Sequence, residues 1–132
     1  MPIYGPKFSE TAFKSGKNIL ASEHVQFIEG GATLDAAAFG AGYVEVGTAI
    51  ARNTTTGKFE PYADGDDAGT PVLPSGYDEF AILNIDWDCD GVTDGIVGEV
   101  IVRGSVYEDK LAANVTDVFK QATPLIRYVK HI

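Results

Sequence analysis

The residues best placed to do chemistry lie in one short acidic segment, residues 86–94. Four carboxylates and a glycine stand there at positions 1, 3, 5, 6 and 9 of a calcium-loop pattern: Asp86, Asp88, Asp90, Gly91 and Asp94. Carboxylates this close repel one another, and a divalent cation would relieve that repulsion. Position 12, however, holds Val97 where a bidentate glutamate belongs, and the flanking residues predict strands instead of EF-hand helices. The competing interpretation is an Asp-rich turn whose side chains cap its own backbone amides.

Aromatic residues near this segment supply a second candidate binding surface. Tyr77 and Phe80 precede the segment, and Trp87 lies within it. Aromatic rings beside carboxylates can bind a sugar or a peptide, so one hypothesis is a glycan- or receptor-binding domain displayed on a particle. A tryptophan at the end of a strand more often covers the edge of its own core, and we favour that interpretation.

Residues suited to catalysis are few. The two histidines, His24 and His131, lie near opposite ends of the chain, and nothing places either beside the single cysteine. Carboxylates around Cys89 would disfavour its thiolate, so we expect the thiol to be unreactive. The chain has no phosphate-binding glycine loop, nucleophile elbow or zinc-protease motif. The sequence therefore predicts a protein that is not an enzyme and needs no cofactor.

Charge excludes further classes of function. The 132 residues carry 10 Lys and Arg against 19 Asp and Glu, a formal net charge of −9. This balance argues against nucleic acid and anionic membranes as partners, because both require clustered cations. Eleven of the acidic residues lie between Glu60 and Glu99, and no Lys or Arg lies among them. Such a block predicts a solvated face, or one that repels its own copies and selects partners by charge.

Length and composition are typical of one globular domain, with 45% hydrophobic and 22% charged residues. The first twenty residues lack the apolar core of a signal peptide, and no apolar run approaches ~18 residues. One cysteine cannot form an intramolecular disulfide. We expect a soluble domain that is made and kept inside the cell.

Strand patterns dominate the chain after its first part. Alternating or continuous apolar residues predict strands over 24–28, 43–51, 59–62, 80–85, 96–107 and 125–129. Gly47 indicates a bulge in the second of these, and residues 63–79 read as a long surface loop. A short helix is expected within 32–39, with Thr33 as its N-cap and Gly40 as its stop.

One longer helix is predicted near 109–122, ended by Pro124. Its apolar stripe consists of Leu111, Val115, Val118, Phe119 and Ala122. Several short strands with one helix indicate a mainly β, α+β domain, built as a small β barrel or sandwich.

Residues 1–23 are predicted to form an extended N-terminal arm before a single domain over 24–132. Prolines and glycines interrupt this stretch, and its apolar residues show no sustained period. A fully solvated tail has little use for four large apolar side chains: Ile3, Tyr4, Phe8 and Phe13. They either pack back on their own domain or dock on a partner.

A set of short motifs in a fixed order runs through the middle of the chain. Gly47-Thr48-Ala49-Ile50-Ala51-Arg52 is followed by Thr56-Gly57-Lys58, then by Phe80-Ala81-Ile82-Leu83 with acidic residues after it, and then by Val102-Arg103-Gly104-Ser105-Val106 and Leu111. Over residues 43–111 this order resembles the head decoration proteins of tailed bacteriophages, the family that contains the phage lambda decoration protein.

The resemblance implies a compact domain of the β-tulip type that forms a homotrimer at local three-fold axes of the mature capsid. Its partner would be the major capsid protein of the same phage, which the trimer clamps after the shell expands. The protein would be made in the cytoplasm of the host bacterium and end in the virion. In that family an N-terminal arm adds to the capsid surface, which makes Ile3, Tyr4, Phe8 and Phe13 the candidate docking side chains.

Overall fold

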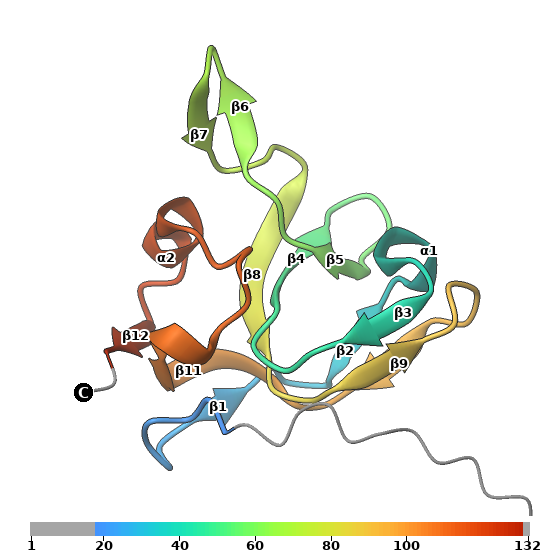
Figure 1. The fold of residues 1–132 in the computed structure, drawn as a ribbon. Coiled ribbons are helices and arrows are strands. Elements are labelled where there is room, and N and C mark those ends of the chain that lie inside the picture. Colours follow the sequence, from blue (N-terminus) through green and yellow to red (C-terminus); the bar gives the residue numbers. More distant parts are fainter. Residues whose placement is uncertain (1–17, 131–132) are drawn as a thin grey trace, which may run out of the picture.

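The computed structural model describes residues 18–130 and shows a mainly β fold (Figure 1). The strands are β1 (Gln26–Phe27), β2 (Ala32–Leu34), β3 (Gly42–Val44), β4 (Ala49–Asn53), β5 (Phe59–Pro61), β6 (Gly65–Asp67), β7 (Thr70–Val72), β8 (Tyr77–Leu83), β9 (Trp87–Cys89), β10 (Gly95–Val97), β11 (Val100–Tyr107) and β12 (Ile126–Val129). The helices are α1 (Ala36–Phe39), the 3-10 helix η1 (Glu108–Lys110) and α2 (Asp117–Ala122). The predicted fold class, a small β barrel or sandwich with few helices, is confirmed.

One curled sheet forms the body of the domain. Its strands follow the order β1-β11-β8-β4-β5-β2-β10, and β12 pairs in parallel with β11. Two further ribbons join this sheet: β3 pairs with β9, and β6 pairs with β7. The β6–β7 ribbon projects away from the body, at the top of Figure 1. The sheet therefore closes only part of a barrel.

Both faces of the central strands are packed. Consecutive residues of β4 and β8 alternate between two buried clusters, as side chains of a strand must. Ile82 belongs to the first cluster, whereas its neighbours Ala81 and Leu83 belong to the second. Phe119 of α2 closes the first cluster, and its ring meets that of Tyr62 edge to face at 4.9 Å. The uninterrupted apolar run of β8 follows from this burial on both sides.

β11 pairs with three other strands and with the residues that precede β1. β1 and β8 flank it at Ile101, and β12 runs beside its last residues. Ile19 also lies against it: the Tyr107 amide donates to the Ile19 carbonyl at 2.7 Å, and the Ile19 side chain is fully buried. Residues 19–21, at the end of the stretch expected as an arm, therefore pack against β11.

The predicted helix over 109–122 is wrong in its first half. Only Asp117–Ala122 form an α-helix, because Thr116 caps it: the Thr116 Oγ1 accepts a hydrogen bond from the Phe119 amide at 3.3 Å. The preceding residues are held in an irregular turn by Asn114. Its side chain accepts from the Ala49 amide at 3.1 Å and donates to the Ala49 and Tyr62 carbonyls at 2.9 and 3.1 Å. Tertiary hydrogen bonds thus replace the first helical turns.

Three other predictions of local structure need correction. α1 does end at Gly40, but Asp35 caps it and Thr33 lies in β2. The strand expected over 43–51 is broken at Gly47, whose φ is +98°. The loop expected over 63–79 contains the β6–β7 ribbon, because Ala68 and Gly69 have φ of +53° and +90°. Positive φ at both central residues is typical of a two-residue hairpin turn.

The irregular turn before α2 yields a first prediction. Asn114→Ala removes three hydrogen bonds and leaves backbone groups beside β4 without partners, so we expect a loss of about 1–3 kcal/mol in the free energy of unfolding. Urea denaturation measures this loss. Asn84→Ala is the matched control, because its side chain makes one bond of 3.4 Å, to Glu99. Equal losses in the two variants would contradict the role given to Asn114.

Candidate functional site

Three of the four carboxylates of the acidic segment 86–94 have separate partners. Asp86 accepts a hydrogen bond from the Val46 amide at 2.8 Å. Asp90 accepts from the amides of Val92 and Thr93 at 2.8 and 2.7 Å, which makes it the cap of its own turn. These backbone hydrogen bonds, led by that from Thr93, lower the pKa of Asp90.

Asp94 links the segment to two other elements. Its carboxylate accepts from the amide of Ala36 at 2.9 Å and pairs with the Lys58 ammonium at 2.7 Å. Lys58 is the larger cause, and the Ala36 amide the second, of the lowered pKa of Asp94. Within residues 18–130, no three His, Cys, Asp or Glu side chains converge as metal ligands. The structure therefore does not bring Asp86, Asp88, Asp90 and Asp94 together around one ion, and at Asp90 it shows the backbone-capping arrangement.

The three aromatic residues near the segment do not share a surface. Trp87 packs edge to face on Phe39, with ring centroids 5.4 Å apart, and contributes to the second buried cluster. Phe80 and Tyr77 pack against the first cluster, and the Tyr77 hydroxyl donates to Glu60 at 2.6 Å. The interpretation of Trp87 as a cover for its own core is confirmed. A glycan platform made of these three rings is not present.

The residues considered for catalysis are also dispersed. Cys89 is buried, and its thiol lies 3.6 Å from the carbonyl of Ala36, to which it can donate. His24 is exposed and precedes β1, while His131 lies outside the described residues. The docking side chains proposed for the arm, Ile3, Tyr4, Phe8 and Phe13, lie outside the described residues as well.

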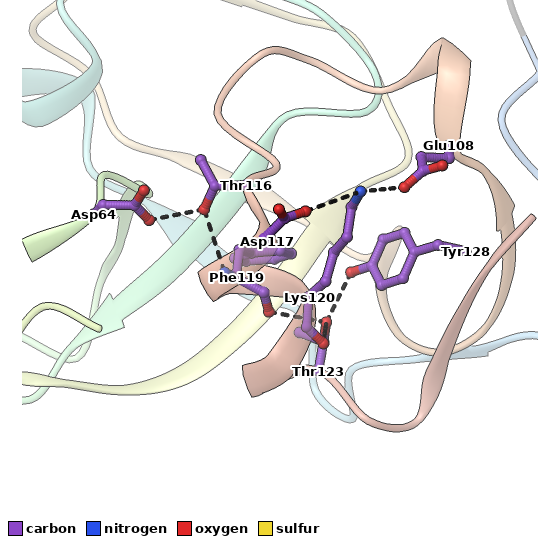
Figure 2. A network of polar contacts seen from close by, with 8 residues as sticks. All are labelled: Asp64, Glu108, Thr116, Asp117, Phe119, Lys120, Thr123 and Tyr128. Atoms are coloured by element: carbon purple, nitrogen blue, oxygen red, sulfur yellow. Dashed lines mark hydrogen bonds and ion pairs between the residues drawn. The ribbon is translucent and has the colours of Figure 1, made fainter. Parts of the chain in front are cut away.

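A polar network joins α2 to the body (Figure 2). Asp64 accepts hydrogen bonds from the Tyr62 hydroxyl at 2.6 Å and from the Thr116 hydroxyl at 2.7 Å. Burial, followed by the bond to Asp64, raises the pKa of Tyr62 to about 12. At the other side of α2, Lys120 pairs with Glu108 and thereby lowers the pKa of that carboxyl. The network anchors the helix.

No pattern in the sequence indicates this network. Asp64 and Thr116 are 52 residues apart, and neither belongs to a recognisable motif. Thr123 is similarly inconspicuous, yet its buried hydroxyl bonds to the Phe119 carbonyl at 3.1 Å and to the Tyr128 hydroxyl at 2.7 Å. Such residues are found only once the fold has brought distant segments together.

Two surface features are candidates for binding. The first is a hollow of about 360 Å³ between β8, β11 and the corner after α2, called the β8–β11 groove below. Its lining consists of Asp78, Glu79, Phe80, Val102, Ala122, Thr123, Pro124 and Leu125. The second is the edge at β10, where Val92 and Ile96 are 84% and 80% exposed.

Ion pairs neutralise part of the acidic block between Glu60 and Glu99. Arg52 pairs with Asp78 at 2.8 Å, and Lys58 pairs with Asp94. Exposed acidic residues are found on the β6–β7 ribbon, on β8 and β9, in the turn after β9 and before β11: Asp66, Asp67, Asp78, Asp88, Asp90 and Glu99. They therefore give one sign of charge to several parts of the surface.

Comparison with protein-family models, with curated proteins and with solved structures yields no match for the chain. Among residues 18–130, no helix has the length and apolar character needed to cross a membrane.

The separated carboxylates yield a prediction for calcium. A site filled at about 100 times its Kd would add about 2.7 kcal/mol and raise the thermal midpoint by several degrees. We expect the midpoint in millimolar Ca²⁺ to equal that in chelator, as measured by circular dichroism, with Mg²⁺ as the control ion. A rise that is specific to Ca²⁺ would contradict the arrangement described for residues 86–94.

The lowered pKa of Asp94 yields a prediction for acid. Because its pKa is lower in the folded than in the unfolded chain, its contribution to stability is complete above about pH 4 and is lost as the pH falls further. Asp94→Asn should therefore reduce stability at neutral pH and lose less of it on acidification than the unaltered protein. Urea midpoints from pH 7 to pH 2 test this.

The control is Asp88→Asn, which removes an equal charge from an exposed position in β9. Parallel midpoint curves for Asp94→Asn and the unaltered protein would show that the contacts of Asp94 with Lys58 and Ala36 contribute nothing.

Proposed function

We propose that the chain is a non-enzymatic structural protein that decorates and cements the mature capsid of a tailed bacteriophage. It would bind as a homotrimer at local three-fold positions through its N-terminal arm and an apolar edge, with the major capsid protein as its partner. The observation that carries the proposal is the ordered set of motifs over residues 43–111, which resembles the head decoration family.

The placement of these motifs in the fold supports the proposal. The stretch from Ala49 to Arg52 lies in β4, residues 56–58 form the turn into β5, and Ala81–Leu83 end β8. β4 pairs with both β5 and β8, and β8 pairs with β11, which carries Val102–Val106. Motifs that are separated in the sequence therefore form adjoining strands, as parts of one architectural unit would.

The anchoring of the arm supports the proposed mode of attachment. Ile19 is buried in the core and Leu20 forms a β-bridge with Val106. The chain is therefore firmly held at the residues that follow 1–17. Extended peptides bind by adding a strand to a partner's sheet while side chains such as Ile3 and Tyr4 fill pockets. Three such arms on one trimer would bind the shell together, and avidity would make up for weak single contacts.

Charge defines the surface that this partner must offer. The exposed acidic residues of the block between Glu60 and Glu99 would face solvent or basic patches of the shell, because acidic patches would repel them.

The proposal is tested by co-sedimentation with undecorated mature capsids and, in parallel, with unexpanded procapsids of the phage that encodes the chain. We expect saturable binding to mature capsids alone. Deletion of residues 2–13 should abolish attachment but leave the body folded, because the deletion ends well before Ile19. An unchanged thermal midpoint checks the folding.

The control replaces Thr55, in the exposed turn between β4 and β5, by serine. Attachment that survives the deletion would refute the role of the arm, and absence of binding to both particles would refute the decoration role.

A further inference from the structure

The β8–β11 groove exists because two strands diverge beside β11. β8 pairs with β4 from Tyr77 to Ile82, but it pairs with β11 only at Ile82 and Leu83. β12 begins to pair with β11 at Gly104, so Val102 lies between the two pairings. The space of about 360 Å³ left there is bordered by the first half of β8 and by the corner after α2.

The groove combines apolar walls with an acidic rim. Phe80, Val102 and Pro124 line it, and Leu125 at its border is 61% exposed. Asp78 and Glu79 contribute carboxylates to the lining. Arg52 pairs with both, at 2.8 and 3.8 Å, so two negative charges meet one positive charge.

One segment of the chain has the complementary chemistry. Residues 1–17 hold Lys7, Lys14 and Lys17 but only one acidic residue, Glu10, so they carry a net +2. The remainder of the chain carries −11, since the total is −9. Residues 7–17 also include two of the apolar anchors, Phe8 and Phe13. A segment with aromatic side chains and lysines matches an apolar groove with carboxylates at its rim.

The path of the chain indicates that the occupant comes from another copy. Going backward from Ala21 to Asn18, the chain passes Ser105, then Tyr107, then the Lys110 ammonium. This direction leads away from Val102 and Leu125. Seventeen residues can span at most about 56 Å, whereas a domain of this size has a radius of gyration of about 14 Å. At Asn18 the described chain therefore runs in the direction away from its own groove, and seventeen residues are long enough to reach a neighbour's.

We infer that the β8–β11 groove of one copy binds residues 7–17 of a second copy, with the Phe13 side chain against Val102 and Leu125. The lysines of the incoming segment lie by Asp78 and Glu79. Two bodies of the same charge are thereby linked through a cationic segment of the chain. Ile3 and Tyr4 remain available for another partner, and the link itself requires no capsid.

The test uses the full chain with the photoreactive p-benzoyl-phenylalanine in place of Phe13. Irradiation should give covalently linked dimers or larger species, and the cross-linked peptides should contain Val102 or Leu125. The same group in place of Thr55, in the exposed β4–β5 turn, is the matched control and should give no such product. Leu125→Asp should lower the yield about tenfold, because a charge would face the incoming ring.

Lys14→Glu combined with Lys17→Glu provides a second variant that leaves the groove intact, and it should lower the yield as well. The thermal midpoint of each variant should equal that of the unaltered protein, which confirms that both are folded. The inference is overturned by a chain that stays monomeric at its highest soluble concentration, by cross-links within one chain, or by cross-links to the β10 edge at Val92 and Ile96. A dimer yield unaffected by Leu125→Asp overturns it too. Co-sedimentation of the Leu125→Asp variant with mature capsids tests the proposed function separately: attachment without cross-linked dimers would leave the capsid role intact when the link between copies is lost.

Discussion

The rest of the structure depends on the pairing of β11 with four other segments. Its first residues lie between β1 and β8, and its last residues lie between β12 and the stretch from Ile19 to Ala21. Val106 and Ile101 are fully buried within it, in the cluster that Phe119 closes. The strand therefore unites the two ends of the described chain with the middle of the sheet. β11 also holds residues 19–21, where the body meets the arm. The gap between β8 and β12 lies beside its residue Val102.

Gly104 is the residue that allows this pairing. Its φ is +152°, and a Cβ at this position would lie 3.2 Å from the side chain of Val25. A larger residue would be strained and crowded there. Gly104 lies where the partner of β11 changes to β12. The same glycine also leaves room for residues 24–25 to approach the strand closely.

Much of the fold follows from local patterns, whereas the contacts that stabilise its irregular parts do not. The run from Phe80 to Leu83 predicts a strand buried on both faces, and Gly40 and Pro124 are correctly read as stops. The stripe over 109–122 is misleading, because three hydrogen bonds of Asn114 to distant backbone groups outweigh the helical preference of the preceding residues.

Spacing alone is equally insufficient for the aspartates over 86–94. Four carboxylates in calcium order point to a metal. Three of them, however, are engaged by backbone amides and by one ammonium group, those of Val46, Val92, Thr93, Ala36 and Lys58. The groove has no sequence signal, since Phe80, Val102 and Leu125 come from three separate elements.

The proposed function unites a firmly packed acidic body with a cationic, apolar arm that starts at β11. The most direct measurement of this account is a cryo-electron microscopy reconstruction of mature capsids mixed with the purified protein. The account predicts trimeric density at the local three-fold positions, with the β body resolved and residues from the start of the chain traced onto the capsid surface. Bare capsids, or density attached only through the body with no arm on the shell, would contradict it.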